Sequence, residues 1–396
     1  MAGLDAQAAA DRYIDALSPA LRAAGEAYAE QSHWLWAISG VLIVAIAWIT
    51  LRLGLLERLR ASLERERPRP WYVAIACALV FSALIAALTA PLDVAAAWLT
   101  DRTLMRPPSS LIAYVARVAN RDCFNILAAS LGSALLLGLA RLAPRSWWAW
   151  SGAALSVAIF ALVWGPYALA HGPATLPPLP AGAARDGMVR LIHDAGLSAR
   201  QVYLVASSDV DGDVTGLPGQ ARVVVNQGMV ANASVPEMRA AIGHLAGHFV
   251  HGDQFGLAVL LSLLTFGALL SVHRLHAPVA RLMGGGGLLG DPAGLPVWAA
   301  IGVAWLAIAT PAERSYIRWI NVRADQFSLD HAREPDGLAI NLLRGWHDDK
   351  VDPGPLEEAI FFDHPSLQSR LEHAMAWKAA HGAAPRPASA PPAPGP

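Results

Sequence analysis

Long apolar segments separated by short polar ones dominate the first part of the chain. Each apolar segment has almost no charged residues and is close to the length of about 20 residues that a helix needs to cross a bilayer. The segments are residues 34–51, 71–90, 124–142 and 147–170. The pattern predicts a four-span membrane domain over residues 34–170, preceded by a polar helical segment over residues 1–33 that lacks the pattern of a cleavable signal peptide.

After residue 170 the pattern becomes that of a small α+β domain. The proline-rich stretch HGPATLPPLPAG is followed by a helix expected over 184–195 and by strands expected at 201–208 and 221–230. Further helices are expected over 312–339 and from 362 to 380. We therefore expect a second domain over 171–380, and an Ala/Pro-rich disordered tail over 381–396.

Two more apolar segments, residues 254–272 and 297–310, lie within this second domain and predict spans five and six. The expected fold is mainly α, a multi-pass membrane protein of about six transmembrane helices with an inserted small α+β domain. Composition agrees, because 55% of residues are hydrophobic and 15% are charged. Contact with membrane lipid follows, and the inner or plasma membrane of a bacterium is the expected location.

Charge and cysteine content exclude other classes. A formal net charge of −1 leaves no basic excess to neutralise phosphates, so nucleic acid is not an expected partner. The two cysteines, Cys77 and Cys123, lie in or beside apolar segments, which argues against a disulfide scaffold or a cysteine zinc site.

The turn between the first two spans carries six arginines and is predicted to be cytoplasmic. Alternation of the spans then places the second domain on the outer side. An additional or re-entrant segment within residues 91–121 would place it on the cytoplasmic side instead.

One helix of the second domain carries candidate chemistry. Ser234 and Glu237 form a capping-box pattern ahead of the stretch AAIGHLAGHFVHGD, in which His244 and His248 are four residues apart. This spacing places both imidazoles on one helix face, as in the zinc-binding pattern H-E-x-x-H. In that pattern the Glu after the first His is the general base, and this chain has Leu245 there.

Other stretches, in order, carry a resemblance to a known family. They are Thr215-Gly216, Arg222-Val-Val-Val, His244-Leu-Ala-Gly-His248, Asn321-Val-Arg-Ala-Asp325, and His364-Pro365 with Arg370. With the spans, they resemble the integral-membrane zinc metalloendopeptidases of the CAAX prenyl protease type, a gluzincin family with the motifs H-E-x-x-H and E-x-x-A-D. The resemblance implies that residues 171–380 form a peptidase-like domain that faces the cytoplasm.

The resemblance implies a role for each matching residue. The metal ligands would be His244, His248 and the residue at position 321, while Asp325 would orient a ligand histidine without touching the metal. His364 and Arg370 would hold substrate and stabilise an oxyanion. The substrate would contact Asp211 or Asp213, where the family has Asn, and would lie along an edge strand formed by Arg222, Val223, Val224 and Val225.

Two departures concern the chemistry itself. Leu245 replaces the general base, and Asn321 replaces the third ligand, a glutamate. An amide binds zinc far less well than a carboxylate does, so zinc is expected to bind weakly or not at all. The favoured interpretation is an impaired protease, or pseudo-protease, that still binds an extended polypeptide.

Two alternatives stay open. One is an active zinc metalloendopeptidase in which Asp211, Asp213 or Asp325 supplies the missing carboxylate. The other is a structural membrane subunit whose former cleft is filled.

Overall fold

A computed structural model describes residues 5–66, 69–168, 176–199, 201–217, 219–285, 287–346 and 349–381. Residues 171–175 of the predicted linker and 382–396 of the predicted disordered tail lie outside these ranges. The chain forms two compact units. The helical unit contains Ala27–Val157 and Leu261–Thr310, and the mixed unit contains Met1–Glu26, Ala158–Leu260 and Pro311–Pro396.

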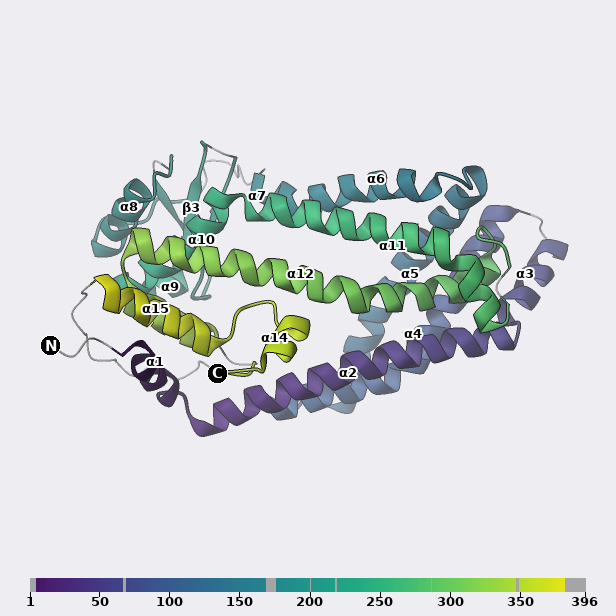
Figure 1. Cartoon of the computed structure of the whole chain (residues 1–396), viewed down its shortest axis with the longest axis horizontal. Coiled ribbons are helices and arrows are strands. Elements are labelled where there is room, and N and C mark those ends of the chain that lie inside the picture. The colour runs from purple at the N-terminus through teal and green to yellow at the C-terminus, as the bar shows by residue number, and fades with distance from the viewer. Residues whose placement is uncertain are drawn as a thin grey trace. The chain divides into compact units, whose positions relative to one another are not determined.

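Six helices in the described part of the chain are long and apolar enough to cross a membrane (Figure 1). They are α2 (Pro19–Arg52), α4 (Pro70–Thr103), α5 (Leu111–Leu142), α6 (Trp147–Ile159) with its π-helical continuation η1 (Phe160–Trp164), α11 (Asp253–Met283), and α12 (Leu295–Ala332) with the preceding 3-10 turn η2 (Pro292–Gly294). The prediction of a mainly α, six-span membrane protein is confirmed.

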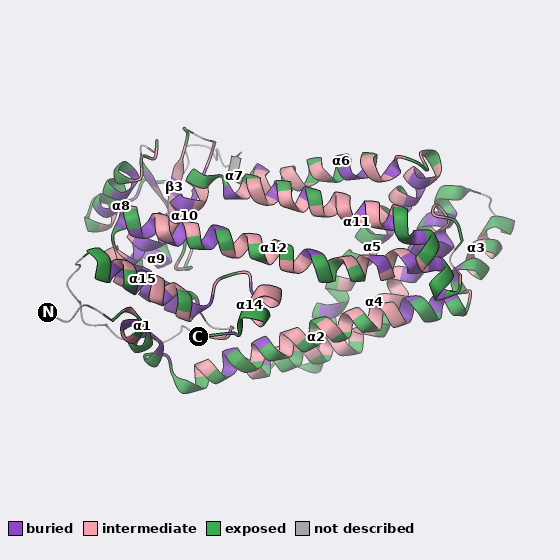
Figure 2. Cartoon of the chain, in the orientation of Figure 1, coloured by how far each residue is buried: buried purple, intermediate pink, exposed green. Residues whose placement is uncertain are grey.

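The spans expose apolar side chains, as lipid-facing helices do. Val41, Ile112 and Phe124 are all more than 70% exposed, and Figure 2 shows mostly exposed and intermediate residues along α2. Hydrocarbon is as apolar as a protein core, so such exposure has no cost in a bilayer. Inside the helical unit, α4 packs on α5, and the buried Trp147 ring stacks on Trp298 with ring centroids 5.1 Å apart.

Several predicted helix boundaries are wrong. The polar segment 1–33 is not one helix, because α1 (Ala6–Asp15) ends before Pro19 and residues 19–33 continue directly into the first span. The helix expected over 312–339 ends at Ala332, because Arg333 has a positive φ of 56° and Pro335 begins a new helix, α13 (Pro335–Gly345). The last part of the chain contains two helices, α14 (Pro355–Phe361) and α15 (Leu367–His381).

Residues 91–121 contain no additional spanning segment among the described residues. The first part of this stretch continues α4 to Thr103, and the last part begins α5 at Leu111. The segment that would have reconciled the two predicted orientations is therefore not found in the described chain. The remaining helices are short: α3 (Leu55–Glu66) follows the first span, and α7 (Gly165–Ala168) extends the fourth.

The mixed unit contains a three-stranded sheet of order β1-β3-β2. The strands are β1 (Val202–Val205), β2 (Gly212–Thr215) and β3 (Arg222–Asn226), and β3 pairs with β1 in parallel and with β2 antiparallel. The expected strand at 221–230 ends early, because Gln227–Asn232 forms helix α9. The sequence prediction missed β2, which is short and begins with glycine and aspartate.

This topology corrects the expected polypeptide-binding edge. The segment Arg222–Val225 lies in the central strand, so its backbone is already paired on both sides. The outer side of β1 is covered by a bridge between Pro178 and Tyr203. Among the described strands, β2 is the one with an open edge. Helix α8 (Ala183–Asp194), which matches its prediction, packs with the sheet and α10 (Val235–His251) around a buried apolar core.

Candidate functional site

Helix α10 begins where its sequence predicts. The Ser234 side chain accepts a hydrogen bond from the Glu237 backbone, and Glu237 bonds back to the Ser234 backbone, which completes the predicted capping box. Glu237 also pairs with Arg344 of α13 at 2.7 Å. At the other end Gly252 adopts the left-handed conformation, φ 67°, which closes the helix.

Two glycines allow α10 to lie very close to the C-terminal part of α12. A Cβ atom on Gly247 would lie 2.9 Å from the Ala324 Cα atom, and one on Gly243 would lie 2.9 Å from the Ser328 hydroxyl. Ser328 also donates a 2.7 Å hydrogen bond to the Ala240 carbonyl. This contact brings His244 of α10 to the side chains of α12.

The two histidines of α10 point their Nε2 atoms at each other. These atoms are 3.1 Å apart, and each ring is held from behind by a carboxylate. The Nδ1 atom of His244 lies 2.8 Å from Asp325, and that of His248 lies 2.8 Å from Asp253. A carboxylate can accept an Nδ1 proton, and an imidazole in that tautomer has its lone pair at Nε2. A cation or a proton between the two Nε2 atoms would satisfy this arrangement.

Each carboxylate is held by an arginine in turn. Arg370 of α15 donates two hydrogen bonds to Asp325, of 2.7 and 2.8 Å. Arg323 of α12 pairs with Asp253 and stacks over the Trp319 ring, 3.8 Å from its centroid. Both aspartates are buried, at 2% and 1% exposure. The two imidazoles therefore have little freedom to rotate.

Two parts of this arrangement fit zinc. Tetrahedral bonds of 2.0–2.1 Å would separate two ligand nitrogens by about 3.3 Å, close to the observed distance. Histidine ligands also commonly donate their other N–H to a carboxylate. Burial lowers the pKa of His244, against the opposing effect of Asp325, and this favours the neutral ring that a metal requires.

The rest of the donor set does not fit. Asn321 is buried, and its amide nitrogen donates to the Ile317 carbonyl one turn earlier on α12. Within the described residues no three His, Cys, Asp or Glu side chains converge as a metal site. The residues present therefore offer two imidazole ligands and one amide, where a full site has a third strong ligand.

Leu245 points toward the sheet side of α10. It packs against the apolar core of the mixed unit and lines a pocket of about 560 Å³ together with His248 and Asp213. Phe249 and Phe255 line the same pocket. The position that would hold a water-activating carboxylate thus presents an apolar surface beside the His248 ring.

The two candidate aspartates of the sheet differ in position. Asp213, on the open-edged strand β2, lines the pocket that contains His248, whereas Asp211 accepts a 2.7 Å bond from the Gly212 backbone just before the strand. Desolvation raises the pKa of the Asp213 carboxyl, and the charge of Asp211 adds to this. Because Asp213 is exposed, solvent screens much of the effect.

A second pocket, of about 440 Å³, lies on the other side of the histidine pair. His244, Asn321, His364 and Arg370 line it. His364 is 52% exposed and pairs with the adjacent Asp363 at 2.8 Å. The structure thus brings four of the predicted site residues to one cavity, with Arg370 already engaged by Asp325.

Asp253 is the residue whose role the sequence prediction missed. In the structure its carboxylate holds the His248 ring. A glycine followed by an acidic residue, directly after a histidine-bearing helix, was the available signal. Without the left-handed turn at Gly252, the carboxylate could not have been directed back at the ring.

Comparisons with known proteins agree on one family. The model of peptidase family M48 matches residues 178–378. The metalloprotease YhfN of Bacillus subtilis (strain 168), described as uncharacterized, is 25% identical over 201 residues, which are 47% of this chain and 46% of that protein. Protease HtpX of Pseudomonas fluorescens (strain SBW25) is 24% identical over 200 residues, covering 46% of this chain and 67% of that protein. The chain therefore spans about half the length of YhfN.

A solved structure shares the fold over nearly the whole chain. The crystal structure of S. mikatae Ste24p superposes with a TM-score of 0.54 and covers 91% of this chain and 99% of that one. The sequence identity of 14% means that this match concerns the fold alone. With six apolar helices and a family match over more than half of its residues, this chain is a multi-pass integral membrane protein that belongs to peptidase family M48.

Proposed function

We propose that this protein is an impaired member of its peptidase family, a pseudo-protease that binds an extended polypeptide. One observation carries the proposal. The two histidines are oriented by Asp325 and Asp253 as metal ligands would be, while the positions of the base and of the third ligand hold Leu245 and Asn321. Peptide hydrolysis at such a centre lacks a group to take the proton from water.

Polypeptide binding is proposed at the open edge of β2. An added strand would pair with the backbone of Gly212–Thr215, and its side chains would enter the pocket beside Leu245. Phe249 and Phe255 make this pocket suitable for an apolar side chain. This replaces the central strand Arg222–Val225 as the proposed contact.

Zinc is proposed to bind weakly. His244 and His248 would hold it, and Asn321 would contribute little, because a neutral amide is a poor zinc ligand. Asp325 and Asp253 would keep the two rings aligned on such an ion. The inner membrane of a bacterium is the proposed location.

The test restores the two missing carboxylates. Zinc content and hydrolysis of an unstructured peptide are measured in detergent for the wild type, Leu245→Glu, Asn321→Glu and the double variant. Asn321→Glu should raise zinc affinity, and hydrolysis should appear only in the double variant, because a base acts here only on metal-bound water. Chelator-sensitive hydrolysis by the wild type would refute the proposal.

A second candidate function rests on Asp213. Its carboxyl has a raised pKa and lines the pocket of His248, so it is the best placed substitute base for an active metallopeptidase. Asp325 is a poorer substitute, because His244 and Arg370 already engage it. If the wild type hydrolyses peptide, Asp213→Asn should abolish the activity and Asp211→Asn should spare it.

A further inference from the structure

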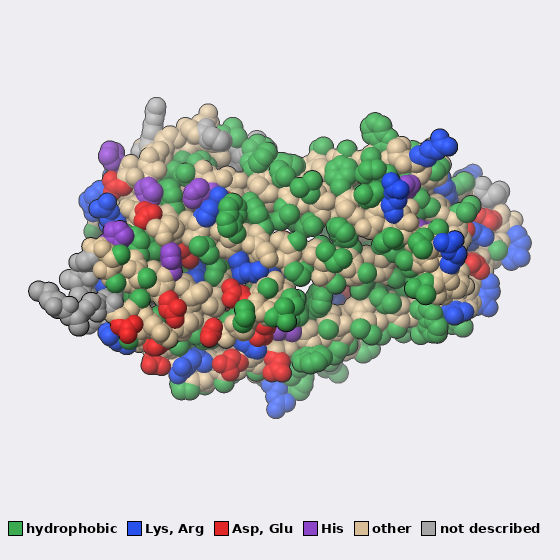
Figure 3. Space-filling view, in the orientation of Figure 1, with side chains coloured by type: hydrophobic (Ala, Val, Ile, Leu, Met, Phe, Trp, Pro, Cys, Tyr) green, Lys and Arg blue, Asp and Glu red, His purple; other side chains and the backbone are tan. Residues whose placement is uncertain are grey.

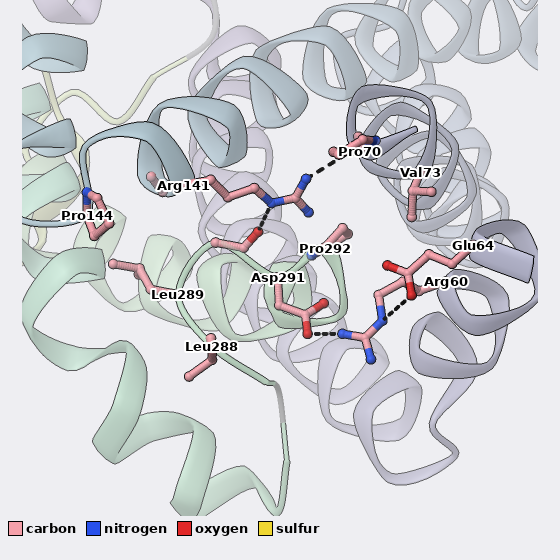
Figure 4. A pocket seen from close by; sticks show the side chains of 12 residues that line it. Arg60, Glu64, Pro70, Val73, Arg141, Pro144, Leu288, Leu289, Asp291 and Pro292 are labelled. Carbon is pink, nitrogen blue, oxygen red and sulfur yellow. Dashed lines mark hydrogen bonds and ion pairs between the residues drawn. The ribbon is translucent and has the colours of Figure 1, made fainter. Parts of the chain in front are cut away.

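A pocket in the helical unit is independent of the peptidase-like site. It has a volume of about 850 Å³ and lies where α3, the start of α4, the end of α5 and the segment 288–292 before α12 meet. Its walls combine apolar residues with four charged ones, namely Arg60, Glu64, Arg141 and Asp291. Figure 4 shows their side chains around the opening. A pocket of this size and composition is suited to a small amphiphile.

The four charged side chains differ in how many ion pairs and hydrogen bonds they make within the protein. Arg60 of α3 pairs with Asp291, whose side chain also accepts a bond from the Ala293 backbone. Arg141 donates to two backbone carbonyls, of Gly290 at 2.7 Å and Pro70 at 3.3 Å. These partners are neutral. The positive charge of Arg141 therefore has no carboxylate partner among the described residues.

Glu64 is a negatively charged residue of the pocket that is only loosely paired. Its carboxylate lies 3.9 Å from the Arg60 guanidinium, beyond hydrogen-bond distance, and its side chain is 53% exposed. Arg60 is already bound to Asp291, so Glu64 retains most of its capacity to accept hydrogen bonds. One wall of the pocket thus presents a cation and another wall presents a loosely held anion (Figure 4).

The surroundings indicate what kind of molecule would enter. Leu142, Leu282 and Leu288, at the same end of the helical unit, are all more than 75% exposed. Basic side chains gather at this end, as Figure 3 shows around α3. Exposed leucines beside arginines at the ends of spans are typical of the bilayer interface. The pocket therefore faces the headgroup region.

We propose that this pocket binds a glycerophospholipid whose headgroup carries a primary ammonium. The phosphodiester would lie on Arg141 and the ammonium would donate to Glu64, while Val73, Ala140 and Leu289 would contact the glycerol and upper acyl chains. An anionic headgroup without an ammonium would leave Glu64 repelling the ligand. A choline headgroup has no N–H to donate. The bound lipid would join α3, α4, α5 and the segment 288–292 of the helical unit.

Lipid exchange on the full-length protein tests this site. The protein is reconstituted in phosphatidylcholine nanodiscs, and bound lipid is measured by native mass spectrometry after addition of phosphatidylethanolamine or phosphatidylglycerol. The ethanolamine lipid should be retained preferentially and should raise the Tm. Soluble glycerophosphoethanolamine, which has no acyl chains, should not displace the bound ethanolamine lipid. Equal retention of the glycerol lipid, or displacement by the soluble headgroup, would overturn the proposal.

Matched variants separate the two contacts. Glu64→Gln should weaken ethanolamine-lipid binding about tenfold and remove the preference over phosphatidylcholine, since a charged hydrogen bond is lost. Arg141→Gln should weaken all three phospholipids. Glu57→Gln on the same helix and Arg145→Gln in the next turn do not line the pocket and should bind as the wild type does. If Arg141→Gln fails to fold, the lipid preference of Glu64→Gln is sufficient to test the proposal. An unchanged lipid preference in Glu64→Gln would refute the site.

Discussion

Asp253 lies 2.8 Å from the Nδ1 atom of His248, across the left-handed turn that ends the motif helix. The aspartate is fully buried and also pairs with Arg323, so it forms a fixed support for the ring. On the other histidine, Asp325 and Arg370 make an equivalent support. Each of the two imidazoles is therefore held in place by a buried carboxylate that is itself paired with an arginine.

We expect Asp253→Asn to weaken zinc binding about 10–100-fold when it is tested in the Asn321→Glu background, because the carboxylate no longer orients His248. Zinc affinity is measured by competition with a chromogenic chelator. Asp330→Asn, an exposed aspartate further along α12, is the control and should leave affinity unchanged. Equal affinity in both variants would mean that Asp253 has no part in metal binding.

Removing Arg370 should destabilise the mixed unit. Arg370→Met leaves the buried Asp325 carboxylate without the two hydrogen bonds from the guanidinium, and breaking a buried pair from one side costs about 3–5 kcal/mol. Thermal unfolding in detergent measures the loss. Arg333→Met removes an exposed arginine nearby and should change the Tm little. A Tm near that of the wild type for Arg370→Met would contradict the assigned pairing.

The close approach of α10 and α12 can be tested at one glycine. A Cβ atom on Gly247 would meet the Ala324 backbone at 2.9 Å, so Gly247→Ala should cost about 1–3 kcal/mol through overpacking. It should also separate His244 from Asp325 and lower zinc affinity. Gly302→Ala, on α12, meets nothing within 4 Å and should be neutral or slightly stabilising. Thermal unfolding of the two variants distinguishes these outcomes.

Membrane orientation is the fourth prediction. Three spans, α4, α5 and α6, separate the arginine-rich turn from the motif helix, and alternation then places residues such as Ser208 outside and Ala61 inside. In a Cys123→Ser background, in which the remaining Cys77 is buried, a membrane-impermeant maleimide should label Ser208→Cys in intact spheroplasts. Ala61→Cys should react only after permeabilisation. The reverse labelling would establish the cytoplasmic orientation that the resemblance implied.

The hydrophobic pattern was sufficient for the membrane part of the fold. Uncharged segments such as residues 71–90 can be stable in only one way in hydrocarbon, as helices that bond all of their own backbone groups. Helix α10 was also predictable, because its capping box and its closing glycine are local signals. The four-residue spacing of His244 and His248 likewise determined that both rings share a face, since helical geometry is local.

Contacts between distant segments were decided by the tertiary structure. The position of Arg222–Val225 in the centre of the sheet depends on β2 folding against it, and nothing within that segment distinguishes a central strand from an edge strand. The pairing of His244 with Asp325, 81 residues later, depends on two glycines that let α10 approach α12. The partners of a side chain are set by which surfaces pack together. The sequence by itself therefore determined the membrane spans, the motif helix and the histidine pair, and only the packing of the elements decided which carboxylates hold each ring and which strand edge stays open.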